Sequence, residues 1–238
     1  MQPNRFNTTT RTEGREIDAG LRKYMSSIYA RMSAGVLVTA ITALFVASSP
    51  ALMTLFLGGP QAYIVIFAPL AVVMFGFHPE RMKASHLMVA FFAISILYGI
   101  SFAAIATMAF QDAAFAMDVA RAFFITSAMF AGLSIYGYTS KTDFSGMRTF
   151  LTMGIWGLVA LSVVNLFFAS TLMSNVIAAA GIILFSGLTV WQTQSSKEMY
   201  NPNLGDEFIS RLAWAAALNL YISFIAMFQY VLHFLNQR

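Results

Sequence analysis

Seven apolar segments, each long enough to cross a lipid bilayer as a helix, limit what this chain can fold into. A hydrocarbon core of about 30 Å requires roughly 17 to 25 helical residues, and only helices or closed barrels satisfy every backbone polar group in lipid. Hydrophobic residues make up 58% of the 238 positions and charged residues 10%, which is outside the range of water-soluble domains. The sequence therefore predicts an all-α integral membrane protein with seven transmembrane helices. The expected spans are Ile28–Ala47, Ala62–Phe77, Leu87–Phe110, Val119–Tyr138, Phe150–Ala169, Val176–Trp191 and Leu212–Leu235, of which the second and sixth are the shortest.

The first 27 residues are polar and charged, without the short apolar region of a cleaved signal peptide. We expect residues 1–27 to form a flexible cytoplasmic tail and residues 28–238 to form one seven-helix membrane domain. The basic residues lie beside the spans rather than in one cluster, so the net charge of +4 does not indicate a nucleic-acid partner. The partner that the composition implies is the lipid bilayer.

The Lys and Arg residues are distributed unevenly between the two ends of the expected spans. Six lie on the N-terminal side and two lie in each of the connections after the second, fourth and sixth spans, so twelve of the fourteen share one side. The opposite side carries only Arg121 and Arg238. The positive-inside rule then places the N-terminus in the cytoplasm and the C-terminus outside.

The residues that carry most enzymatic chemistry are absent from the expected spans or are wrongly spaced. All ten Asp and Glu residues lie outside the spans, which argues against a proton relay or an aspartyl protease. The three histidines are not spaced as a metal site. Ser134 lies between glycines in GLSIYG, but the GxSxG pattern of serine hydrolases is not matched. We therefore expect no catalytic, metal-binding or cofactor-binding residues and no enzymatic activity.

The last expected span carries a stripe of polar residues that lipid would not tolerate. At about 100° per residue these side chains share one helix face, and each unpaired amide or hydroxyl would cost on the order of several kcal/mol in hydrocarbon. We expect this face to point at protein or water, with the other spans packed around the helix. The polar groups either bond neighbouring helices, at about 0.6 kcal/mol each, or line a polar path. The stripe comprises Asn219, Ser223, Ala226, Tyr230 and His233, with Gln229 beside it.

Other neutral polar residues lie in or near the fifth and sixth spans. They are Asn165 in the fifth span, and Gln192 and Gln194 at the end of the sixth. Their carbonyl oxygens can coordinate a hard cation weakly, but without a carboxylate they cannot form a tight calcium site. A leak path fits these residues better than a calcium store does.

Four motifs in the sequence are similar to those of one membrane-protein family. The longest, RAFFITSAMFAGLSIYGYTSKTDFSGMRTF, lies within Val119–Phe168, and the others are RMSAGVLVTAITAL at Arg31–Leu44, GLTVWQTQ at Gly187–Gln194 and AALNLYISFIAMF at Ala216–Phe228. Together they resemble the Bax inhibitor-1 family, in its bacterial branch. The resemblance implies a seven-helix fold in the bacterial inner membrane, with a central last helix that the other six wrap. It also implies a pH-sensitive calcium leak, and in other members protective or protease-modulating roles.

The chain departs from the family pattern at two positions. The resemblance implies a pair of aspartates that act as pore and pH sensor, and here those positions hold Gln192 and Ser223. Two facing aspartates share a proton and switch near neutral pH, whereas glutamine and serine have nothing to titrate. Relatives have a basic partner near the end of the second span, and Arg81 is its nearest match here. The expected pore or latch positions are Gln192, Ser223, Asn219, Asn165 and Arg81.

Two functions from different classes stay open. The first is a calcium or cation leak whose proton latch is absent or altered, with Ca²⁺ as the permeant ion. The second is a non-transporting regulatory protein that modulates a membrane protease or a stress response. Its contact surfaces would be the charged tail and the connections Lys141–Arg148 and Ser195–Arg211.

The uneven distribution of basic residues predicts the orientation of the chain in the membrane. A reporter that is active only outside the cytoplasm should be active when it is fused after Arg238. The measurement is the reporter's activity beside that of a cytoplasmic reporter at the same position. If only the cytoplasmic reporter works, the number of spans is even, and the short second or sixth segment does not cross.

Overall fold

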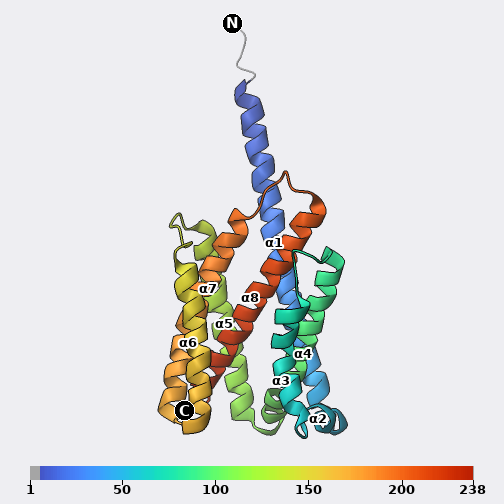
Figure 1. The fold of residues 1–238 in the computed structure, drawn as a ribbon, viewed down its shortest axis with the longest axis vertical. Coiled ribbons are helices and arrows are strands. Elements are labelled where there is room, and N and C mark those ends of the chain that lie inside the picture. Colours follow the sequence, from blue (N-terminus) through green and yellow to red (C-terminus); the bar gives the residue numbers. More distant parts are fainter. Residues whose placement is uncertain (1–5, 238) are drawn as a thin grey trace.

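The computed structural model describes residues 6–237, with side chains from residue 19 onward, and within this range the chain is all-helical (Figure 1). The expectation of an all-α fold is therefore confirmed. The eight helices are α1 (Phe6–Ala47), α2 (Pro50–Leu57), α3 (Gln61–Gly76), α4 (Ala84–Gln111), α5 (Ala113–Thr139), α6 (Met147–Phe168), α7 (Thr171–Glu198) and α8 (Asp206–Leu235).

Six of these helices are long and apolar enough to cross a membrane, namely α1 and α4 to α8. The second expected span differs, because α2 and α3 are long and apolar enough to cross a membrane only as a pair, and this pair is bent by 75°. A proline begins α2, where its missing N–H costs nothing, and Gly58 and Gly59 separate it from α3. The seven-span prediction is thus confirmed for six helices, and the seventh depends on this bent pair.

The sixth expected span is longer in the structure than in the sequence prediction. We expect it to end at Trp191, where the apolar run stops, but α7 continues for seven further residues to Glu198. Four polar residues of this extension are buried against protein, namely Gln192, Thr193, Gln194 and Ser196. Because the span prediction is based on apolar residues, it omits a polar helix end that packs against protein.

The N-terminal region is helical where the sequence predicts a flexible tail. A single helix, α1, runs without interruption from Phe6 through residue 27 into the first span, and it extends beyond the other helices in Figure 1. Tyr24 and Met25 are buried in the core, so the helix packs against the bundle already before the first expected span. Residues 1–5 of the expected tail lie outside the described residues.

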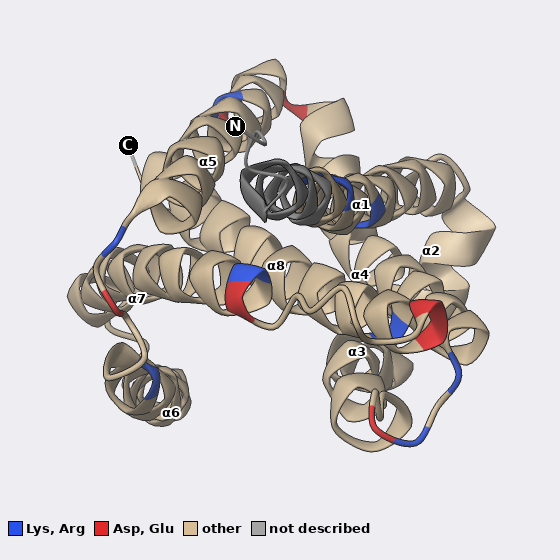
Figure 2. Ribbon diagram, turned by 90° about the horizontal axis from the view of Figure 1, so that it is seen from above, with Lys and Arg blue, Asp and Glu red and all other residues tan. Residues whose placement is uncertain are grey.

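The last helix is by far the most buried of the candidate spans. In α8, 67% of the 18-residue apolar window is buried, against at most 33% in any other span. It packs against α1, α4, α5 and α7 (Figure 2). Among the described residues α6 packs only against α7, and α3 packs against α2 and α4. The expectation that all six other spans wrap the last helix is therefore not confirmed.

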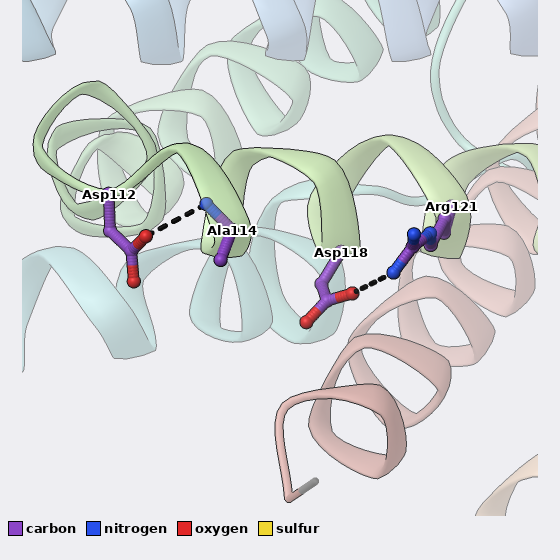
Figure 3. A network of polar contacts seen from close by, with 4 residues as sticks. All are labelled: Asp112, Ala114, Asp118 and Arg121. Carbon is purple, nitrogen blue, oxygen red and sulfur yellow. Dashed lines mark hydrogen bonds and ion pairs between the residues drawn. The ribbon is translucent and has the colours of Figure 1, made fainter.

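The connections with most of the basic residues lie at one end of the bundle. Figure 1 shows the α3–α4, α5–α6 and α7–α8 connections at the end from which α1 extends. At the opposite end, the Asp112 carboxylate accepts a hydrogen bond from the Ala114 N–H at 2.8 Å and caps α5 (Figure 3). Arg121 pairs there with Asp118 at 3.1 Å, so its charge is balanced locally. Most of the acidic residues also lie at the basic end, so the two ends differ less in net charge than in their numbers of basic residues. Arg238 lies outside the described residues.

Some glycines of the spanning helices allow close helix packing and others do not. A Cβ added at Gly99 in α4 would lie 2.7 Å from the Thr39 carbonyl oxygen of α1. Gly154 and Gly181 are equally crowded by side chains of α7 and α8. Around Gly132 and Gly157, by contrast, a Cβ would meet nothing within 4 Å, so these two glycines do not mediate packing.

This difference predicts opposite outcomes for two matched substitutions. We expect Gly99→Ala to lower the free energy of unfolding by about 1–3 kcal/mol, because the added methyl group meets backbone that cannot move aside. Gly157→Ala should leave it unchanged or raise it slightly, since alanine is the better helix former. Thermal unfolding of both variants in one detergent compares them, and equal melting temperatures would contradict the close α1–α4 contact.

Candidate functional site

The two positions that the resemblance marks as a latch lie side by side between α7 and α8. The Ser223 hydroxyl of α8 donates a hydrogen bond to the Gln192 side-chain carbonyl of α7 at 2.9 Å. Ser223 is fully buried and Gln192 is 9% exposed. These side chains therefore share one neutral hydrogen bond across the two helices.

Gln192 belongs to a polar face of α7 that is turned into the protein. The Ser196 hydroxyl donates to the Gln192 backbone carbonyl at 2.7 Å, and the Thr189 hydroxyl donates to the Phe185 carbonyl at 2.8 Å. Neither bond uses a charged partner. Within the described residues no Asp, Glu, Lys or His side chain is hydrogen-bonded to Gln192 or Ser223, and no group of three acidic, His or Cys residues could hold a metal ion.

Asn165 lies at the far end of α6, away from the α7–α8 contact, and ties α6 to α7. Its amide donates to the Ser174 hydroxyl at 2.7 Å, and its carbonyl accepts from the Ser170 N–H at 3.1 Å. These bonds close the turn in which Ala169 adopts a left-handed conformation with φ of 47°. Asn165 also lines a cavity of about 280 Å³ together with Gln229, Tyr230 and His233.

Asn219 and Arg81 are not brought to the latch positions. Both side chains are exposed, and Arg81 lies in the α3–α4 connection beside His78 and Glu80. Of the stripe expected to point at protein or water, Ser223 is buried, whereas Asn219 and, at the far end of the helix, Gln229 and His233 are exposed. Figure 1 shows that α8 runs obliquely across the bundle.

A different arginine fixes the end of the molecule where Arg81 was expected to act. Arg31 of α1 donates to the Ser210 carbonyl at 3.0 Å and lies 4.3 Å from the centre of the Trp214 ring. Both partners belong to the first turns of α8. The sequence marks Arg31 as unusual, since it is the only basic residue inside the first expected span, but it does not indicate the partner.

A second buried polar contact on α8 was missed from the sequence. The Thr39 hydroxyl of α1 lies 2.7 Å from the Tyr221 hydroxyl and 3.0 Å from the Ser95 carbonyl of α4. Tyr221 is fully buried. Tyrosine counts as an apolar residue in a membrane pattern, so only a search for hydroxyl pairs between spans could have found this contact.

Gln194 has a structural role that separates it from Gln192. Its carbonyl accepts from the Phe144 N–H at 3.0 Å, and its amide donates to the Thr142 carbonyl at 2.7 Å. The side chain therefore holds the α5–α6 connection against the end of α7. The Lys197 ammonium fixes the same region by donating to the Tyr138 carbonyl at 2.9 Å.

Known proteins are similar to this chain over nearly its whole length. A family model described as "Inhibitor of apoptosis-promoting Bax1" matches residues 21–238. Uncharacterized protein RP147 of Rickettsia prowazekii is 34% identical over 231 residues, which cover 97% of this chain and 96% of the relative. Inner membrane protein YbhL of Escherichia coli K12 is 32% identical over 229 residues, which cover 92% of this chain and 94% of the relative. The stretch matched by the family model contains both Gln192 and Ser223.

The two glutamines of α7 predict different responses to removal of the side chain. We expect Gln194→Ala to accelerate trypsin cleavage after Lys141 by roughly tenfold or more, because two hydrogen bonds of about 1 kcal/mol each no longer close the connection. Gln192→Ala should leave the cleavage rate unchanged, since its side chain contacts α8 instead. The rates are compared by gel densitometry on detergent-solubilised protein. Equal rates for the two variants would show that Gln194 does not hold this connection.

Proposed function

Because the chain belongs to the Bax inhibitor-1 family, we propose that it forms a passive leak path for calcium or other cations across a bacterial inner membrane. In this proposal the bent α2–α3 pair completes seven spans, the N-terminus is cytoplasmic, and α8 is the central helix. The polar residues of α8 and α7 line the path. The path holds no carboxylate pair, so its conductance does not follow the proton concentration.

The observation that carries this proposal is the buried hydrogen bond between Ser223 and Gln192. A leak needs polar groups at depth, and lipid would not tolerate these two at the α7–α8 contact without a partner. A neutral hydrogen bond between membrane helices is worth only about 0.6 kcal/mol on average. A contact of this strength closes the path weakly, and protons in the physiological range do not alter it.

Further polar groups lie on both sides of this contact. Asn219 is exposed one turn of α8 toward the basic end, and the cavity lined by Asn165 and Gln229 lies toward the opposite end. Between the contact and that cavity, the rings of Phe185 and Tyr230 pack at a centroid distance of 6.0 Å. This arrangement supports a path that is closed by two layers, one of hydrogen bonding and one of aromatic packing.

The proposal predicts calcium flux that is nearly independent of pH. Uptake by proteoliposomes containing the purified protein should be almost constant between about pH 6 and pH 8, since neither Gln192 nor Ser223 titrates. Protein-free liposomes give the background. The absence of flux above this background would favour the regulatory alternative, and a steep pH dependence would place a proton latch elsewhere in the molecule.

Restoring two carboxylates should create the missing pH dependence. In the double variant Gln192→Asp with Ser223→Asp, two acids within hydrogen-bonding distance would share one proton, which raises one of their two pKa values. Flux through this variant should therefore change across the same pH range. The single variant Asn203→Asp is the control, because it adds an exposed carboxylate in the α7–α8 connection, outside the proposed path, and should leave the profile flat. If the double variant also has a flat profile, these positions do not control the path.

A further inference from the structure

A long groove separates α1 from α5 on the side of the bundle where these helices do not pack against each other. Within the described residues α1 and α5 form no direct contact, and a cavity of about 820 Å³ lies between them with Phe224 of α8 at its base. A second cavity of about 430 Å³ shares Val36, Ala40, Phe123 and Phe224 with the first. The two cavities therefore form one continuous groove that faces the surrounding bilayer.

The wall of the larger cavity changes from polar to apolar along its length. At the end from which α1 extends, it is lined by Arg22, Tyr29 and Tyr138. Toward the middle of the bundle, the lining consists of apolar residues such as Leu37 and Phe123. A cationic head region that continues into an apolar channel matches the shape of an anionic amphiphile.

A buried hydroxyl without a partner points to the same kind of occupant. Ser134 of α5 lines this cavity at 6% exposure, and its Oγ atom has no hydrogen-bond partner. Such a group should be bonded in a native structure, and its missing partner should be an acceptor from outside the chain. Ser134 lies one helical turn further from the basic end than Tyr138. In a phospholipid, the ester carbonyl is displaced from the phosphate in the same direction, toward the acyl chains.

We propose that this groove binds one anionic phospholipid from the leaflet at the basic end of the molecule. The phosphate lies at Arg22, an ester carbonyl accepts the hydrogen of the Ser134 hydroxyl, and an acyl chain follows the cavity toward Phe224. Phe123 and Tyr138 are fifteen positions apart, which is about 22 Å along the helix. One leaflet of hydrocarbon is about 15 Å thick, so the cavity has room for the chain and for the ester region. Basic pockets between membrane helices bind lipid head groups in this way.

This lipid site is independent of the proposed cation path, and it is tested without measuring flux. Native mass spectrometry of the delipidated protein in detergent counts the lipids that are retained when dioleoyl phosphatidylglycerol or dioleoyl phosphatidylethanolamine is added. We expect one bound lipid and a preference of about fivefold for the anionic one, as a single basic residue near a head group gives.

Steric variants test whether the lipid occupies the groove. Ala131→Trp adds an indole beside Ser134 on the exposed face of α5 and should remove the bound lipid. Ala160→Trp is the matched control, because Ala160 is also an exposed alanine of a spanning helix and lines no cavity found in the described structure. If Ala131→Trp does not fold, Ala40→Trp blocks the groove from the α1 wall.

A charge variant tests the position of the head group. Arg22→Gln should abolish the preference for phosphatidylglycerol while one lipid is still retained. Lys23→Gln should leave the preference unchanged, because Lys23 is exposed but does not line the groove.

Three results would overturn the proposal. These are equal lipid retention in the tryptophan variants of Ala131 and Ala160, equal binding of the two lipids by the unmodified protein, and a protein dimer that dissociates in Ala131→Trp. The last result would mean that a second copy of the chain covers the groove.

Discussion

Both fully buried hydroxyl groups of α8 find their partners on other helices, and this requirement fixes how the bundle is arranged. Tyr221 meets Thr39 of α1 at 2.7 Å, and Ser223 meets Gln192 of α7 at 2.9 Å. In hydrocarbon no water is available to form a hydrogen bond with either hydroxyl. The helices α1 and α7 must therefore lie on opposite flanks of α8, each at a defined position along its axis. The apolar packing around these two contacts fills space, but the hydrogen bonds set the register of the helices.

Charged side chains near the basic end hold the helices together through backbone groups instead of ion pairs. Arg31, Lys197 and Arg211 each donate to a backbone carbonyl on another element, and the Glu207 carboxylate accepts the N–H of Ala84 at the start of α4. The last contact places a negative charge at the positive end of a helix dipole. Arg121 and Asp118 do form an ion pair, but that pair lies within one helix. Added salt should therefore weaken the contacts between helices very little.

The sequence predicts the helices of this fold better than their packing. The length of the apolar segments located six of the seven expected spans. It failed at the bend between α2 and α3, where an apolar segment is not one straight helix, and at the end of α7, where the helix continues through polar residues. For the candidate site, the pairing of Gln192 with Ser223 was predictable because both positions could be matched to family motifs. The locations of Asn219 and Arg81 were not predictable, since periodicity gives the face of a helix but not which turns its neighbours cover. The contacts of Arg31 depend on the approach of α1 to α8, which is invisible in either segment alone.

The peripheral position of α6 has a consequence for how this protein comes apart. Only 11% of its apolar window is buried, and it packs against α7 alone, through Leu151, Leu158 and the close approach of Gly154 to Leu184. Its backbone cannot melt in lipid, because the unpaired N–H and C=O groups would find no water. We therefore expect α6 to leave the bundle as an intact rod, hinged at the Asn165 turn, while α8 and its four neighbours stay assembled.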